Sequence, residues 1–188
     1  MAPRNGVTTR LSRDEWLARA LDILATEGQA KLRVEAICAA LGVTKGSFYW
    51  HFKDRDDFVR GLARYWSDQF TDPVMAQVTQ SANNAGERLK ALLYAVSDGG
   101  FARYDVSIRA WAAQDPDLVA ALVRDVDERR LEFVGSIFAE LGFEVDEIGM
   151  RARACIAYLS FESSFLVKSN DQDRRKMLDL FYDMIAYK

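Results

Sequence analysis

Residues 34–52 read VEAICAALGVTKGSFYWHF, and this stretch decides which fold we expect. Ile37 and Leu41 are four residues apart, so they lie on one face of a first short helix. Phe48 and Phe52 are again four apart and give a second short helix its buried face. Two such helices joined by a tight turn form a helix-turn-helix, whose second helix can enter the major groove of DNA.

The turn and the outward face of the second helix fit the same prediction. Gly42 stands where the chain must turn with a positive φ, and Val43 fills the corner between the helices. The side chains left to point outward can hydrogen-bond phosphates and base edges: Thr44, Lys45, Ser47, Tyr49 and His51. The alternative for this stretch is an ordinary pair of core helices.

The flanking segments favour the helix-turn-helix over that alternative. Ser12 and Glu15 have the spacing of a capping box, which predicts the start of a preceding helix. Residues 54–57, Asp-Arg-Asp-Asp, place acidic side chains at the positive end of a following helix. Three short helices, with a fourth leading away, predict a compact N-terminal headpiece.

A whole block of residues in this region resembles the TetR family of bacterial transcriptional regulators: Gly28, Val34, Ile37, residues 41–53 and Phe58. The resemblance covers roughly the first third of the chain. It implies a DNA-binding regulator that dimerises through its last two long helices, but it names no ligand. Arg33 departs from the family's frequent Thr or Ser helix cap, and Cys38 replaces its more usual Ala.

The charge distribution matters because a DNA-binding protein must neutralise phosphates. The net charge is −3, yet the first 60 residues carry ten Lys and Arg against eight Asp and Glu, so the acidic excess lies elsewhere. Candidate phosphate contacts are Arg4, Arg10, Arg33, Lys45, Lys53 and Arg55, each of which could instead be a solvated surface cation. The DNA-binding residues that we predict are Arg33, Thr44, Lys45, Gly46, Ser47, Tyr49, Trp50, His51 and Lys53.

The composition, 49% hydrophobic in 188 residues, is typical of globular proteins. No apolar run is long enough for a membrane span and the N-terminus lacks the apolar core of a signal peptide, so we expect a cytoplasmic protein without a membrane partner. Cys38 and Cys155 are far apart in the sequence, which predicts reduced thiols and neither a metal site nor a cofactor.

The rest of the chain shows helical periodicity and no strand pattern, so we predict an all-α fold. Residues 1–53 would form a three-helix helix-turn-helix DNA-binding domain and residues 54–188 a helical effector-binding and dimerisation domain. The helices expected in the second domain cover residues 54–70, 86–97, 105–113, 116–141 and 146–168.

The two late helices have apolar residues on more than one face, which predicts a homodimer. A recognition helix of about seven residues spans only about 10 Å, so two copies on palindromic double-stranded DNA are needed to read a full site. Candidate interface residues are Phe133, Ile137, Ala154, Ala157, Tyr158, Phe161 and Phe165. The alternative is that both are core helices of a monomer.

Aromatic residues between the headpiece and the late helices suggest a pocket for a small-molecule effector. The candidate lining residues are Trp66, Phe70, Tyr94, Tyr104, Ile108 and Trp111, although ordinary core packing also explains such a set. We therefore predict a repressor that such an effector releases from DNA by displacing the helix with Trp66. A regulator controlled by a protein partner is an alternative. An all-α enzyme is disfavoured, because the single histidine, His51, lies within the helix-turn-helix.

Overall fold

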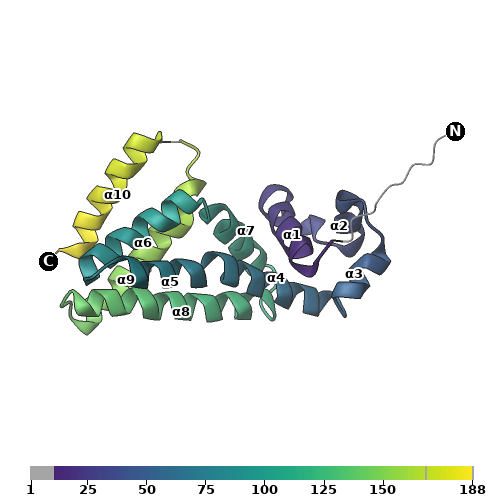
Figure 1. Cartoon of the computed structure of the whole chain (residues 1–188), viewed down its shortest axis with the longest axis horizontal. Helices are drawn as coiled ribbons and strands as arrows, with labels where there is room; N and C mark the ends of the chain where they lie inside the picture. Colours follow the sequence, from purple (N-terminus) through teal and green to yellow (C-terminus); the bar gives the residue numbers. More distant parts are fainter. Residues whose placement is uncertain (1–10, 168, 188) are drawn as a thin grey trace.

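The computed structural model describes residues 11–167 and 169–187, in which every regular element is a helix. The all-α prediction is confirmed. The α-helices are α1 (Arg13–Glu27), α2 (Val34–Leu41), α3 (Lys45–His51), α4 (Arg55–Phe70), α5 (Asp72–Ser81), α6 (Ala85–Gly99), α7 (Ala102–Ala112), α8 (Val119–Glu140), α9 (Val145–Phe161) and α10 (Asp171–Ala186), and two short 3-10 helices are η1 (Gln29–Lys31) and η2 (Glu162–Ser164). The molecule is elongated, with α2 and α3 at one end and α10 at the other (Figure 1).

The first helix begins with the capping box that the sequence predicts. The Ser12 Oγ accepts a hydrogen bond from the Glu15 amide at 3.2 Å, and the Glu15 carboxylate accepts one from the Ser12 amide at 2.7 Å. The hydrogen bond from the Ser12 amide to the carboxylate lowers the pKa of Glu15. The helix ends before Gly28, whose φ of +81° lies in the region that favours glycine.

One core cluster holds the headpiece together and continues beyond it. Trp16 of α1 packs edge to face against Phe48 and Phe52, with ring centroids 5.8 and 6.3 Å apart. Towards the centre of the molecule the same cluster continues through buried residues of α4, α7 and α8: Phe58, Leu62, Trp66, Ile108, Trp111, Val119, Val123 and Val126. The predicted boundary after residue 53 therefore lies within a continuous core, and the division into two domains stays a prediction.

A second core cluster fills the other half of the molecule, between α5, α6, α8, α9 and α10. Its fully buried residues include Leu89 and Leu93 of α6, Phe138 of α8 and Cys155 of α9. Phe181 of α10 joins this cluster and stacks on Tyr158 of α9, with centroids 4.2 Å apart. The chain therefore packs its last helix back onto the bundle.

The structure differs from the predicted helices in three places. The prediction of one helix over 146–168 is wrong at its C-terminal end, because α9 ends at Phe161 and the backbone tightens into η2 before Phe165 extends. Serine is a weaker helix former than alanine or leucine, because its hydroxyl competes for backbone hydrogen bonds, and serines follow Phe161 where the helix ends. The sequence analysis missed α10 and α5. Helix α5 starts at the expected break, with Pro73 in the first turn, where its missing N–H needs no partner.

None of the helices in the described segments has the length and apolar character that crossing a bilayer requires.

Candidate nucleic-acid interface and ligand cavity

Helix α3 presents one face to the core and the other to solvent. Its N-terminus is capped by Thr44, whose Oγ1 accepts a hydrogen bond from the Ser47 amide at 3.4 Å. Phe48 is fully buried, whereas Tyr49 and Trp50 are 60% and 69% exposed. A seven-residue helix therefore carries two large aromatic side chains on an outward surface.

The turn before α3 has the geometry that the sequence predicts. Gly42 adopts φ +65° and ψ +30°, the left-handed conformation that ends α2. Its amide donates to the Ala39 carbonyl at 3.3 Å, and the Val43 amide donates to the Cys38 carbonyl at 3.0 Å. These bonds satisfy carbonyl groups at the end of α2 and fix the angle at which α3 leaves the turn.

An ion pair that sequence reasoning missed joins the two helices of the motif. The Lys45 Nζ lies 2.7 Å from a carboxylate oxygen of Glu35 on α2, and both side chains are exposed. The hydrogen bond from Lys45 lowers the pKa of Glu35, and the same bond raises the pKa of Lys45. A DNA phosphate would compete with Glu35 for this ammonium group.

The predicted DNA-binding residues lie around one end of the headpiece. The exposed members are Arg33, Thr44, Lys45, Gly46, Tyr49, Trp50 and Lys53, and the half-buried members are Ser47 and His51. Arg33 precedes α2 without capping it through its side chain. Among the other phosphate candidates, Arg55 forms an ion pair with Asp115 at 3.3 Å, and Arg4 and Arg10 lie outside the described residues.

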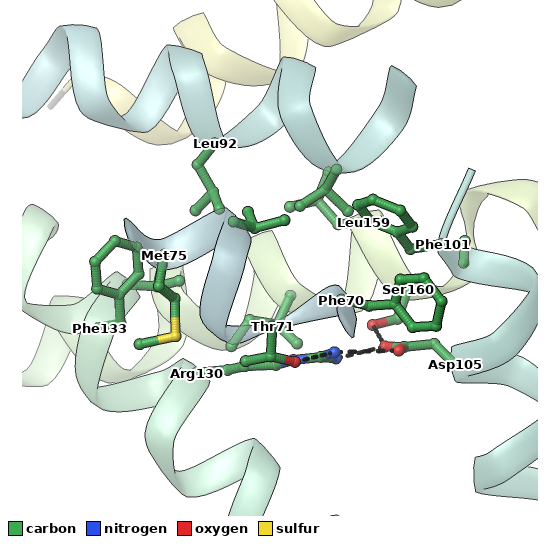
Figure 2. A pocket seen from close by; sticks show the side chains of 15 residues that line it. Phe70, Thr71, Met75, Leu92, Phe101, Asp105, Arg130, Phe133, Leu159 and Ser160 are labelled. Carbon is green, nitrogen blue, oxygen red and sulfur yellow. Dashed lines mark hydrogen bonds and ion pairs between the residues drawn. The ribbon is translucent and has the colours of Figure 1, made fainter. Parts of the chain in front are cut away.

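A cavity of about 540 Å³, including its mouth, lies in the second half of the molecule. Helices α4 to α9 enclose it, and Figure 2 shows its side chains from close by. Apolar side chains form most of its wall: Phe70, Val74, Met75, Leu92, Val96, Phe101, Ala102, Phe133, Val134, Ile156 and Leu159. The four polar lining residues are Thr71, Asp105, Arg130 and Ser160.

These four polar residues are hydrogen-bonded to one another at one side of the cavity (Figure 2). The Arg130 guanidinium donates to the Asp105 carboxylate at 2.6 and 3.3 Å, and to the Thr71 hydroxyl at 2.7 and 3.0 Å. The Ser160 hydroxyl donates to Asp105 at 2.7 Å. Asp105 is only 4% exposed, so this network replaces the water that the carboxylate loses on burial.

The network reaches the helix that connects the cavity to the headpiece. The Trp66 Nε1 of α4 donates to Asp105 at 3.1 Å, and the Arg130 guanidinium lies 4.9 Å from the centre of the Trp66 ring. Sequence reasoning did not find Asp105 or Arg130, because charged residues without a motif around them are most often solvated. Asp105 lies on α7 and Arg130 on α8, and these helices meet only in the folded chain. The sequence around either residue therefore does not indicate their pairing.

Of the predicted effector-binding residues, Phe70 lines the cavity and Trp66 lies behind its polar side. Tyr104 stacks on Phe70 from outside the lining, with ring centroids 4.9 Å apart. Ile108 and Trp111 belong to the core cluster shared with the headpiece. Tyr94 donates a hydrogen bond to Asp179 of α10 at 2.8 Å. The structure thus brings together only some members of the predicted set.

The predicted interface residues also divide between several environments. Ala157, Phe161 and Phe165 are exposed and Ala154 is half-buried. Ile137 is buried in the second core, Phe133 lines the cavity, and Tyr158 stacks on Phe181. Met150 on α9, which the sequence analysis did not single out, is 62% exposed.

Comparison with known proteins shows what this sequence and this fold are similar to. Residues 17–62 match the family model described as bacterial regulatory proteins, tetR family. No curated protein matches the sequence significantly. The fold is similar to those of many solved structures, which include three regulators at low sequence identity.

The ketosteroid transcriptional regulator KstR2 of Mycobacterium tuberculosis is 17% identical, with a TM-score of 0.69 over 93% of this chain and 92% of that one. A putative TetR-family regulator from Rhodococcus sp. is 17% identical, with a TM-score of 0.74 over 93% and 98%. AibR, solved in complex with isovaleryl coenzyme A and operator DNA, is 18% identical, with a TM-score of 0.72 over 92% and 97%.

The family match covers the headpiece, where the buried faces of α2 and α3 and the Gly42 turn build a helix-turn-helix. The neighbours are regulators rather than enzymes. The chain is therefore a DNA-binding transcriptional regulator whose headpiece, over residues 17–62, is that of the TetR family.

Proposed function

We propose that the protein is a repressor that binds palindromic operator DNA as a homodimer and is released by a small, largely apolar effector. Residues 1–53 would bind DNA, and residues 54–188 would bind the effector and dimerise. The observation that carries the proposal is the course of α4, which begins at Arg55 beside the recognition helix and ends at Phe70 in the cavity wall. A ligand that moves Phe70 would therefore move the helix that holds the headpiece.

The DNA contacts that we propose come from the outward face of α3 and the residues beside it. Lys45, Lys53 and Arg33 would contact phosphates, and Tyr49 and Trp50 would contact sugars and thymine methyl groups. Exposed aromatic side chains on a small headpiece are consistent with a surface that a partner covers. Thr44, Gly46, Ser47 and His51 complete the proposed contact set.

The dimer would form through the outer edge of α9. Met150, Ala154, Ala157 and Phe161 follow one another at spacings of four, three and four residues, so they lie along one stripe of the helix. The small residues in the middle would allow a second helix to approach closely. Phe165, just beyond the helix and 68% exposed, extends this stripe.

An effector in the cavity would act through two connections to the headpiece. One is Phe70, at the end of α4. The other is Tyr104, which stacks on Phe70 and whose hydroxyl donates to Asp22 of α1 at 2.8 Å. The AibR complex, which contains both isovaleryl coenzyme A and operator DNA, supports the idea that this fold can couple a small molecule to DNA.

The test uses a DNA fragment from the region upstream of the protein's own gene and measures binding by fluorescence anisotropy at several salt concentrations. We expect tight binding that weakens steeply with salt, because phosphate contacts release counterions. Lys45→Ala and Tyr49→Ala should weaken it while circular dichroism and sedimentation stay unchanged. Binding without salt dependence would contradict the proposed interface. If the protein binds the DNA but no candidate effector changes its affinity, the proposed release by a small molecule would be wrong and the proposed DNA binding would stand.

A further inference from the structure

We infer that the effector is an uncharged, mostly apolar molecule with one oxygen-bearing group, a ketone or an alcohol, which binds against Thr71, Ser160 and Arg130. This inference rests on the proposal that the cavity is the effector site. It concerns the chemistry of the ligand, which the arrangement of the polar lining residues determines.

The apolar wall sets the first requirement. Eleven of the 15 lining residues are apolar, and they come from α4 to α9, so a ligand meets hydrocarbon on most of its surface. The polar residues gather at one side in Figure 2, with Leu92 on the opposite side. A ligand that fits this division has an apolar body and a single polar end.

The charges at the polar side are already paired. Arg130 and Asp105 form an ion pair at 2.6 Å, in which their side chains are 15% and 5% exposed. The next cation, Arg109, lies 3.8 Å from Asp105 and binds Asp127 with two hydrogen bonds of 2.8 and 2.6 Å. A ligand carboxylate would have to displace Asp105 from Arg130 or lie unpaired beside it, and both carry a large desolvation cost.

A ligand cation meets the opposite difficulty. Asp105 already accepts hydrogen bonds from Trp66, Ser160 and Arg130. An ammonium group would therefore find these acceptor positions occupied and would lie beside the Arg130 guanidinium. An uncharged group avoids both costs.

The groups that remain available match one neutral oxygen. The Thr71 Oγ1 accepts two hydrogen bonds from Arg130, and within the described residues its hydroxyl hydrogen has no acceptor. The Ser160 Oγ donates to Asp105, and in the same part of the chain it accepts no hydrogen bond. A ligand carbonyl oxygen could accept from Thr71, and a ligand hydroxyl could also donate to Ser160.

The experiment compares four probes of equal chain length, 2-octanone, 2-octanol, octanoate and octylammonium, by isothermal titration calorimetry on the full-length protein at neutral pH. We expect the ketone and the alcohol to bind at least tenfold more tightly than either ion. Tighter binding of octanoate or octylammonium, or no binding of either neutral probe, would overturn the inference.

Two variants test the assigned groups, after circular dichroism shows that they fold. Thr71→Val should weaken 2-octanone binding about fivefold, and the matched control Thr79→Val, on the exposed side of α5, should leave it unchanged. Asp105→Asn leaves Arg130 without its carboxylate, so octanoate should then bind about tenfold more tightly than it binds the wild type. An unchanged affinity in both variants would overturn the assignment.

Operator binding, measured in parallel, separates this inference from the proposed function. If the ketone binds but the operator is not released, the ligand class stands and the proposed sensing fails. If an anionic effector releases the operator while the neutral probes do not bind, the sensing stands and the ligand class fails.

Discussion

The rings of Phe70 and Tyr104 are nearly parallel, with an interplanar angle of 11° and 4.9 Å between their centroids. Phe70 faces the cavity, and the Tyr104 hydroxyl donates to Asp22 on α1. Burial and this hydrogen bond raise the pKa of Tyr104, so its hydroxyl remains a donor at neutral pH. The cavity wall and the first headpiece helix are therefore in contact through one aromatic pair.

Tyr104→Phe tests whether this pair transmits ligand binding. The variant keeps the ring stack but loses the hydrogen bond to Asp22, which should lower the free energy of unfolding by about 1 kcal/mol. Arg103 still contacts Asp22 at 3.4 Å, so the headpiece stays attached. We expect unchanged operator affinity without effector and weaker release with it, measured by anisotropy. Tyr187→Phe, at an exposed position, is the control. Full release by the variant would contradict a role for the hydroxyl.

Glu35→Gln should strengthen operator binding, because it removes the carboxylate that competes with phosphate for Lys45. Lys45→Ala should weaken binding and reduce the slope of log K against log salt by about 1. Both are measured by anisotropy across a salt series. Glu132→Gln on α8 makes the same change in net charge at an exposed position away from α3. Equal effects of the two glutamate variants would mean that net charge, not the Lys45 pair, is responsible.

Phe161→Glu should convert the proposed dimer into monomers, because it places a carboxylate in the apolar stripe of α9. Sedimentation velocity measures the oligomeric state. Leu180→Glu makes a similar change on α10, where the side chain is 60% exposed and outside the proposed interface. If the dimer persists in Phe161→Glu but dissociates in Leu180→Glu, the interface lies on α10 and not on α9.

Arg130→Met should lower the free energy of unfolding by about 3–5 kcal/mol, because the buried Asp105 loses its hydrogen-bonded cation and keeps only Arg109 at 3.8 Å. Adding Asp105→Asn to this variant should restore part of the loss, since no unpaired charge remains. Urea denaturation of both variants and of Asp105→Asn alone gives the coupling energy. Additive losses would show that the two side chains do not stabilise one another.

Cys155 should resist alkylation in the folded protein. Burial raises its pKa to about 12, so the reactive thiolate is scarce at pH 8 and the sulfur is also covered. Between the thiol's unfolded pKa of about 8.5 and its folded value, rising pH should lower stability, because only the unfolded thiol releases its proton. Mass spectrometry after iodoacetamide treatment follows labelling, with Thr79→Cys as an exposed reference site. Equal labelling rates at both positions would contradict this burial.

The headpiece could be predicted because its signals are local. The Ser12 capping box, the Gly42 turn and the four-residue spacing of Phe48 and Phe52 each act within one or two helical turns, and the structure has all three. Helix α10 has such signals as well, with Asn170 as its cap and buried residues at Leu178, Phe181 and Ile185.

The cavity could not be predicted in the same way, because six helices build it. Periodicity shows that Phe70 and Trp111 each have a buried face but not which neighbour covers it. Trp111 lies in the core shared with the headpiece because α7 packs against α1, whereas Phe70 reaches the cavity. Asp105 and Arg130 are 25 residues apart, and no sequence spacing signals their pairing.

The core that runs without interruption from Trp16 to Val126 limits how this regulator can be redirected to other promoters. A chimera that transplants residues 1–53 onto a foreign sensor would sever the packing of α1 against α7 and leave apolar side chains without their neighbours. Retargeting should instead exchange the solvent-facing side chains of α3 alone, because Tyr49 and Trp50 can change while Phe48 stays in place.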